Sequence, residues 1–222
     1  MSFDERLTEA YLHAGKNSPL KNFVTKPTLL KVIGNVHGKA ALDAGCGDGA
    51  YSRTLLEECG ASSVVAIDHS QDMLNVAKLQ NASESIHYLG LDAKRIGELM
   101  PEKFDLALVN YVLQFSETKS ELEQVCKSVY ESLKPAGRMV GCVPNGVPEF
   151  CYDPKRCSQY QFRLESFYAE DDKDLMLRAG FDKVDWHQLE LSRDGEKKLG
   201  KSFFEGFLEP TPIDIVFECH KL

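Results

Sequence analysis

Short apolar runs alternate with helix-like segments along most of the 222 residues of this chain. Such runs suit strands that are buried on both faces, and each run but the last is followed within a few residues by helical sequence. Strands separated by helices predict an α/β fold with a mostly parallel sheet, covered on both faces and joined by right-handed crossovers. The five runs are 39–43, 63–68, 86–89, 105–109 and 139–143.

Helix signals are clearest in two places between these runs. From residue 119 to residue 134, apolar side chains recur at helical spacing, and Pro135 and Gly137 are expected to end this helix. A second helix is expected to begin after Ser70, whose hydroxyl suits an N-cap, and to run toward Gln80.

The sequence after residue 143 departs from this rhythm. A helix is predicted at 169–179 with Gly180 as its cap, and two later runs partly alternate polar and apolar residues, as antiparallel strands do. These runs are 183–191 and 213–220. Because no linker divides the chain, we expect a single domain, 1–222. Its expected parts are an N-terminal helical lid at 1–27, a cofactor-binding core at 28–143, a small lid insertion at 144–170, and a C-terminal helix and strands at 171–222.

Charge and cysteine content narrow the classes of function. Asp and Glu outnumber Lys and Arg by 34 to 26, and the formal net charge of -8 argues against nucleic acid and anionic membranes as partners. A small neutral or cationic ligand fits this balance better. The seven cysteines include no C-x-x-C pair and the N-terminus is acidic, so a cytoplasmic protein with free thiols is expected. His37 and His87 have no metal-ligand spacing, and no metal site is expected.

A glycine-rich turn between a predicted strand and a predicted helix is the most informative segment. Gly45, Gly47 and Gly49 stand at alternate positions, which lets the backbone approach a ligand closely. The first amides of the following helix would favour a carboxylate or phosphate. Gly45, Gly47 and Ala50 also match the looser dinucleotide fingerprint, so the glycines alone do not distinguish NAD from other nucleotides.

Polar residues stand at the ends of four successive predicted strands: Asp43, Asp68, Asp92 and Asn110. The carboxyl ends of parallel strands meet at one edge of a sheet, where open α/β folds bind ligands. Asp68 is placed to accept hydrogen bonds from both hydroxyls of a ribose, and Asp92 to reach an adenine amine. Asp48, inside the turn, would repel a pyrophosphate but not a ligand with an ammonium group and no phosphate.

This pattern resembles the class I S-adenosylmethionine-dependent methyltransferases. The motif acid-x-Gly-x-Gly-x-Gly is intact at residues 43–49, and the ribose acid, the adenine-side acid and the segments 104–110 and 133–138 follow in the family's order. The resemblance implies a Rossmann-like, doubly wound sheet of seven strands whose last strand is antiparallel. The whole chain is also similar to the toxoflavin-type small-molecule methyltransferases, including the aromatic segment 203–207 and the prolines Pro210 and Pro212.

The same resemblance implies S-adenosyl-L-methionine as the cofactor and assigns its contacts. The glycines of the turn and the Asn110 backbone would hold the methionyl part, and Asp68 the ribose. Asp92 with Ala93 would hold the adenine, and Met73 would pack on the purine face. The residues expected at the cofactor are Tyr11, Asp43, Gly45, Gly47, Asp68, His69, Met73, Asp92, Ala93 and Asn110.

The acceptor side is less determined. Tyr11 is expected to close over the cofactor, because an aromatic face attracts a sulfonium as it attracts an ammonium. Glu149, Asp153 and His187 are candidate bases for an acceptor that starts protonated, and the sequence does not choose among them.

We therefore predict a methyltransferase that acts on a small molecule by N- or O-methylation, with protein and nucleic-acid substrates disfavoured. The acidic balance and the short insertion offer no basic groove for a polymer. An NAD-dependent oxidoreductase and a non-catalytic cofactor-binding scaffold stay open as alternatives. The acceptor, the number of methyl groups transferred and the oligomeric state are not determined by the sequence.

Overall fold

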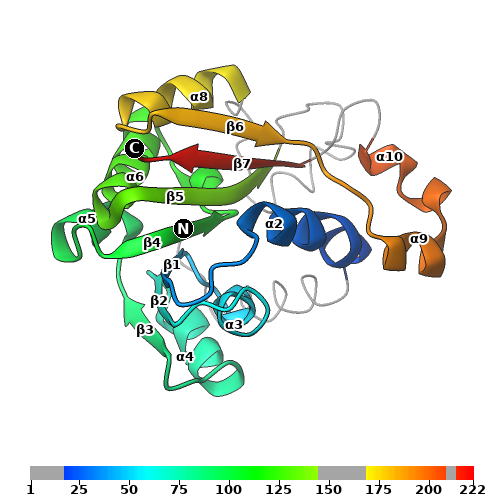
Figure 1. Cartoon of the computed structure of the whole chain (residues 1–222), viewed down its shortest axis with the longest axis horizontal. Coiled ribbons are helices and arrows are strands. Elements are labelled where there is room, and N and C mark those ends of the chain that lie inside the picture. Colours follow the sequence, from blue (N-terminus) through cyan, green and yellow to red (C-terminus); the bar gives the residue numbers. More distant parts are fainter. Residues whose placement is uncertain (1–17, 145–168, 209–213) are drawn as a thin grey trace.

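Seven strands form one sheet in the order β3-β2-β1-β4-β5-β7-β6 (Figure 1). The structure is a computed structural model that describes residues 18–144, 169–208 and 214–222. In it, β7 runs antiparallel to both of its neighbours, and the other neighbouring strands pair in parallel. The predicted sheet of seven strands with an antiparallel last strand is confirmed. The strands are β1 (Ala40–Ala44), β2 (Ser63–Asp68), β3 (Ile86–Gly90), β4 (Phe104–Asn110), β5 (Leu133–Pro144), β6 (Lys183–His187) and β7 (Asp214–His220).

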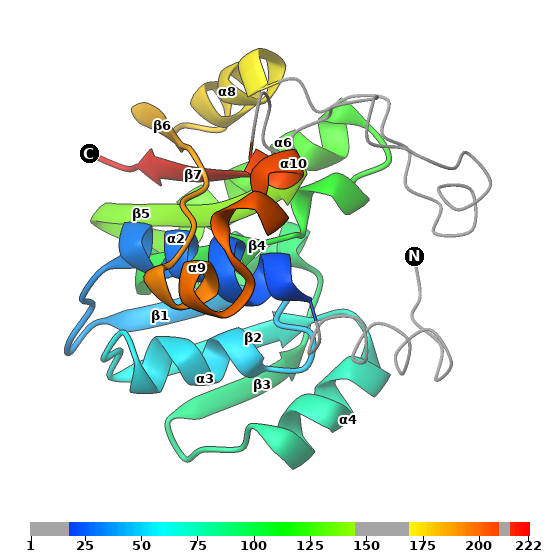
Figure 2. The ribbon, with the colours of Figure 1, turned by 90° about the vertical axis from the view of Figure 1, so that its right-hand side faces the viewer.

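Helices cover both faces of this sheet, which Figure 2 shows with the strands one above another from β6 to β3. One face carries α2 (Lys26–Ile33), α3 (Ala50–Glu57) and α4 (Gln71–Gln80). The opposite face carries α5 (Ile96–Leu99), α6 (Lys119–Ser132) and α8 (Ala169–Arg178). A π-helical turn, η1 (Lys21–Thr25), leads into α2, and the short helices α9 (Arg193–Leu199) and α10 (Glu205–Leu208) follow β6.

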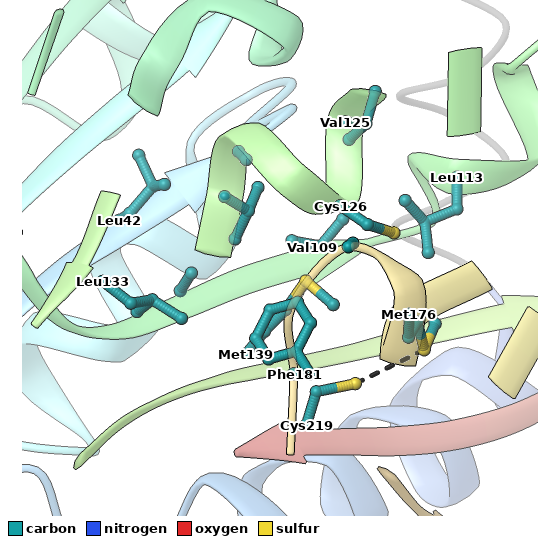
Figure 3. Close-up of a cluster of buried hydrophobic side chains, with 14 of the residues drawn as sticks. Leu42, Val109, Leu113, Val125, Cys126, Leu133, Met139, Met176, Phe181 and Cys219 are labelled. Carbon is teal, nitrogen blue, oxygen red and sulfur yellow. Dashed lines mark hydrogen bonds between the residues drawn. The ribbon is translucent and has the colours of Figure 1, made fainter. Parts of the chain in front are cut away.

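Two separate apolar cores hold the helices to the sheet. The predicted stripe of α6 faces one of them, and its apolar side chains are buried as their helical spacing requires. Figure 3 shows Val125 and Cys126 of α6 in this core, together with Val109 and Met139 of the sheet. Each such side chain removed from water contributes about 1.5–3 kcal/mol, so the stripe fixes the position of α6.

The predicted helix ends are built as the sequence indicates in two cases. The Ser70 hydroxyl oxygen accepts a hydrogen bond from the Met73 amide at 3.3 Å, which caps α4. At the end of α8, Gly180 has a φ of 118°. The amides of Gly180 and Phe181 donate to the carbonyls of Leu177 and Met176 at 3.1 and 3.3 Å, which forms a Schellman motif.

Two predicted boundaries were wrong. Helix α6 ends at Ser132 rather than at Pro135, because Leu133 already pairs with Phe104 and begins β5. Arg138 then pairs with Leu106, so residues 134–137 bulge from the ladder instead of capping a helix.

The predicted strand 183–191 ends at His187 because the chain leaves the sheet there. Beyond β6, the Glu190 amide donates a hydrogen bond to Thr28 Oγ1 of α2 at 2.8 Å. The backbone that follows β6 therefore packs on a helix and not on β7.

Several predicted segments lie outside the described residues. They include residues 1–17 of the N-terminal lid, residues 145–168 of the insertion, and Pro210 and Pro212. Among the helices that the structure does describe, none combines the length and the apolar character needed to cross a bilayer.

Gly141 of β5 leaves no room for a side chain. A Cβ at this position would overlap the Val109 carbonyl oxygen and the Phe217 ring. We expect Gly141→Ala to lower the free energy of unfolding by about 1–3 kcal/mol, as overpacking of a core does. Gly90→Ala in β3 is the matched control, since the nearest atom to its Cβ would be 3.7 Å away. Urea denaturation measures both variants, and equal stabilities would contradict the packing described.

Candidate functional site

The loops after β1 and β4 meet where the strand order reverses. After β1 the sheet grows through β2 and β3 on one side, and the chain then returns to place β4 on the other side of β1. Open α/β sheets bind ligands at such a reversal, outside the carboxyl ends of the strands. The glycine turn follows β1 and Asn110 ends β4, so the predicted residues of both loops lie at this point.

The glycine turn has a backbone that L side chains rarely adopt. Gly45, Gly47 and Gly49 have φ values of 74°, 52° and 76°. A Cβ at Gly45 would overlap Val112 Cγ2, so only glycine lets the turn lie directly against the loop that follows β4. The amides of Gly45 and Cys46 donate to the Ile67 carbonyl at 2.8 and 2.9 Å and hold the turn to β2.

Asp48 has a local partner in this turn. Its Oδ1 accepts a hydrogen bond from the Ala50 amide at 3.2 Å, so a first amide of α3 already faces a carboxylate of the protein. Lys21 of η1 lies near Asp48, and burial lowers the pKa of this lysine while Asp48 raises it.

Asp68 connects the glycine turn to the end of β2. Its Oδ2 accepts a hydrogen bond from the Gly47 amide at 2.9 Å, and its Oδ1 accepts one from the Ser70 amide at 2.8 Å. A carboxylate has about four acceptor positions, so these two bonds leave capacity for the hydroxyls of a ribose. His69 is mostly exposed, and its Nδ1 lies 3.7 Å from Asp68 Oδ1. Asp68 is thus both the anchor of the turn and a candidate ribose ligand.

Asp43 lies beneath the turn and is almost fully buried. The Ser52 hydroxyl of α3 donates to its Oδ2 at 2.5 Å. Burial raises the pKa of Asp43 to about 7, and the charges of Asp68 and Asp48 act in the same direction, while the Ser52 hydrogen bond opposes them. A direct contact between Asp43 and the cofactor stays a prediction.

The residues expected on the adenine side come from α4 and from the turn after β3. Met73 is buried, and its Cε would lie 3.1 Å from a Cβ at Gly47, so it packs under the glycine turn. Asp92 caps the short helix η2 (Ala93–Arg95) by accepting a hydrogen bond from the Lys94 amide at 2.9 Å. The Lys94 ammonium lies 3.6 Å from the other carboxylate oxygen, and the Asp92 side chain is 49% exposed, so a ligand can still reach it.

Two oxygens at the end of β4 have the character expected of ligand contacts. Among the described residues, Asn110 Oδ1 and Gln114 Oε1 are buried and accept no hydrogen bond. A buried polar atom without a partner is costly, so these atoms suit donors that a ligand supplies. The residues present therefore fit a polar ligand that is held between the glycine turn and β4.

Other predicted residues are not brought to this point. His187 lies on β6, three strand spacings or about 14 Å across the sheet from β4, and its Nε2 is 3.6 Å from Glu218 Oε2. In the aromatic segment, Phe204 is buried and packs edge-on against Phe23 at 6.4 Å between ring centres. Tyr11, Glu149, Asp153 and the side chain of Phe207 lie outside the described residues.

One group of potential metal ligands occurs among the described residues, away from the glycine turn. It comprises Asp185, Glu218 and His220 on β6 and β7. Lys183 and Arg138 each approach one of these carboxylates to 2.6 Å, so both acids already have cationic partners. The absence of a metal site stays a prediction.

The sequence analysis did not single out a buried polar cluster at the carboxyl edge of the sheet. Asp214, the first residue of β7, accepts hydrogen bonds at Oδ2 from the hydroxyls of Tyr111 and Thr25. The Cys142 thiol of β5 lies against the Tyr111 hydroxyl. Burial raises the pKa of Asp214 to about 6, and the two hydrogen bonds lower it. Tyr111 directly follows Asn110, and this was the one sequence signal that could have led to the cluster.

Comparison with known proteins agrees with this arrangement. Residues 41–137, somewhat less than half of the chain, match the family model described as a methyltransferase domain. This segment is similar to methyltransferase domains, and it contains the glycine turn, Asp68, Asp92 and Asn110.

Individual relatives of the methyltransferase domain are similar over limited stretches. The chain is 36% identical over 109 residues to a malonyl-[acyl-carrier protein] O-methyltransferase of Pseudescherichia vulneris, covering 49% of this chain and 40% of that protein. The chain spans about half the length of the curated relatives it matches.

Solved structures share the fold over nearly the whole chain. An S-adenosylmethionine-dependent methyltransferase from Mesorhizobium loti superposes with a TM-score of 0.71 at 18% identity, covering 93% of this chain and 99% of that one. A Haemonchus contortus phosphoethanolamine N-methyltransferase 2 in complex with S-adenosyl-L-methionine gives a TM-score of 0.69 at 19% identity, covering 98% of this chain and 57% of that one.

Asp68→Ala is expected to weaken cofactor binding without unfolding the domain. The change removes the acceptor of the Gly47 amide and the predicted ribose ligand. Hydrogen bonds to a charged group are worth about 1.5–3 kcal/mol, so the Kd for S-adenosylhomocysteine should rise roughly 10- to 100-fold in calorimetry. Asp182→Ala is the control, because this exposed carboxylate only accepts the Leu222 amide. If Asp68→Ala bound S-adenosylhomocysteine as tightly as the wild type, Asp68 would not be a cofactor ligand.

Asp43 is expected to make stability depend on pH. Its pKa is about 7 in the folded protein and near 3.8 when unfolded, so the folded state holds this proton more tightly. Its contribution to stability is complete below about pH 4 and is lost as the pH rises toward 7. Between pH 4 and pH 8, Asp43 should change the free energy of unfolding by an amount on the order of a few kcal/mol. Asp43→Asn should remove this change, which urea denaturation measures. Parallel pH profiles of the variant and the wild type would contradict this assignment.

Proposed function

We propose that this protein is an S-adenosylmethionine-dependent methyltransferase that acts on a small-molecule acceptor through N- or O-methylation. The observation that carries the proposal is the glycine turn held by Asp68 at the reversal of the strand order, opposite the unpartnered oxygen of Asn110. A scaffold that only kept the fold would have no reason to leave that oxygen buried and without a donor.

The placement of the residues supports the predicted contacts. Asp68 would hold the ribose, Asp92 with Ala93 the adenine, and Met73 would form the floor beneath the nucleoside. Gly45, where a Cβ would overlap Val112, and Gly47, which has a positive φ, would let the backbone meet the methionyl part together with Asn110. His69, exposed beside Asp68, would edge the adenosine.

S-adenosylmethionine supplies a methyl group on a sulfonium; its carbon bonds to the acceptor as the carbon–sulfur bond breaks, and the electron pair stays on sulfur. The residues of the chain then have to align the acceptor, exclude water and manage its proton. Few side chains need to take part, which fits the absence of a catalytic signature in the sequence.

Charge supports a small acceptor over a polymer. The net charge is -8, and Asp48, Asp68 and Asp92 are the acids proposed around the cofactor. Such acids repel the phosphates of nucleic acids. The malonyl-[acyl-carrier protein] O-methyltransferase and the phosphoethanolamine N-methyltransferase named above transfer methyl groups to different atoms, so similarity to known enzymes does not by itself identify the acceptor.

Incubation with methyl-labelled S-adenosylmethionine and fractionated cell metabolites tests the proposal. We expect one metabolite fraction to gain label, and purified RNA and protein to gain none. Label in RNA or protein at a higher rate than in any metabolite would refute the small-molecule assignment.

Calorimetry separates the alternative of an NAD-dependent oxidoreductase. Asp48 lies within the turn, where a pyrophosphate would meet a like charge. We therefore expect heat on titration with S-adenosylhomocysteine and none with NAD; the reverse result would favour the oxidoreductase. Binding of S-adenosylhomocysteine without turnover of any metabolite would favour a cofactor-binding scaffold.

A further inference from the structure

Asp214 is a buried carboxylate at the start of β7. It pairs with Pro144, the last residue of β5, and so lies at the carboxyl edge of the sheet, beside the loops that hold the cofactor residues. Its exposed fraction is only 7%. Tyr111 follows Asn110 directly and reaches from the end of β4 across β5 to Asp214 Oδ2.

Among the described residues, the groups that face Asp214 are neutral. They are Thr25 from η1, Tyr111 from the loop after β4, and Cys142 from β5. Both hydroxyl donors share Oδ2, and within the described part of the chain no donor reaches Oδ1 and no ion pair includes Asp214. Buried charges are normally paired, and no described residue supplies a cation to this carboxylate.

The backbone at Tyr111 is strained in a way that serves this contact. Its φ of 55° lies in the left-handed region, which is uncommon for an aromatic residue. The Tyr111 amide nevertheless donates to the Cys142 carbonyl at 2.9 Å, so the strained residue is fixed to the end of β5. Strained residues gather at functional sites, where the surroundings hold them in place.

We propose that Asp214, positioned by Tyr111 and Thr25, binds the protonated nitrogen of an amine acceptor and removes its proton. This inference rests on the proposed function and selects N-methylation. A carboxylic acid would be repelled by Asp214 and by the acids proposed around the cofactor, and a phenol would leave the buried charge without a counter-ion. A primary or secondary amine supplies both the cation and the nucleophile.

The proton step balances within the site. The ammonium nitrogen gives one proton to the Asp214 carboxylate, which becomes a neutral carboxylic acid, and the nitrogen regains the lone pair that methylation requires. Burial brings the pKa of Asp214 to about 6, so the group is ionised near neutral pH and is a stronger base than an exposed aspartate.

The first experiment compares acceptor classes and one pair of variants. Aliphatic primary and secondary amines, phenols and short carboxylic acids are each incubated with methyl-labelled S-adenosylmethionine. We expect turnover of an amine, and a loss of about 100-fold or more in its kcat/KM in Asp214→Asn. The asparagine oxygen still accepts from Tyr111 and Thr25, so the fold is retained. Asp194→Asn is the matched control, because that side chain lies on α9 and is 62% exposed.

The second experiment uses pH to separate chemistry from structural support. In the wild type, kcat/KM for the amine should rise as the pH passes through about 6, where Asp214 ionises. Tyr111→Phe removes a hydrogen bond that lowers the pKa of Asp214, so this rise should move to higher pH. If the bond between Tyr111 and Asp214 served only the fold, Tyr111→Phe would change stability, and the pH at which kcat/KM rises would stay the same.

The outcomes are distinguishable. Turnover of phenols or carboxylic acids alone, no turnover of any amine in the panel, or full amine activity in Asp214→Asn would overturn this inference. If S-adenosylhomocysteine still binds in those cases and any acceptor or metabolite fraction gains label, the proposed function stands. Absence of that binding in the wild type would overturn the proposed function, and this inference with it.

Discussion

Strand β1 has a paired neighbour on each side, and the candidate site depends on that position. Because β2 lies on one side and β4 on the other, the loop after β1 meets the ends of both. The glycine turn can then donate the amides of Gly45 and Cys46 to β2 while Gly45 lies directly against the loop after β4. A strand at the sheet edge would offer only one of these contacts. The central position of β1 therefore turns a short flexible segment into a fixed surface.

Two kinds of carboxylate surround this surface, and burial distinguishes them. Asp68 and Asp92 accept hydrogen bonds from backbone amides. Asp43 and Asp214 are buried, and burial raises their pKa values to about 7 and about 6. The first pair is suited to bind hydroxyls and amines, whereas the second pair is close to the range in which a group exchanges protons near neutral pH.

The two sides of the site are also built over different distances along the chain. The proposed cofactor side comes from loops that follow β1, β2, β3 and β4 in order, and its contacts connect residues such as Gly47 and Asp68. The proposed acceptor side joins distant segments, since Asp214 of the last strand contacts Thr25 from before the first. The segment that matches the methyltransferase model, 41–137, contains the first set of residues but neither Asp214 nor Thr25.

The alternation of strands and helices, the glycine turn and the row of polar residues at successive strand ends can all be predicted from the sequence. These features are local: the spacing of apolar residues sets each element, and parallel strands bring their ends to one edge whatever the rest of the chain does. By contrast, the pairing of Leu133 with Phe104, which ends α6 early, and the distance of His187 from the glycine turn become visible only in the folded chain. The same is true of Asp214, Tyr111 and Thr25, whose contact needs the antiparallel return of β7 beside β5. Such long-range pairings have no periodic signature, because their energy comes from burial and hydrogen bonds that exist only once the sheet has formed.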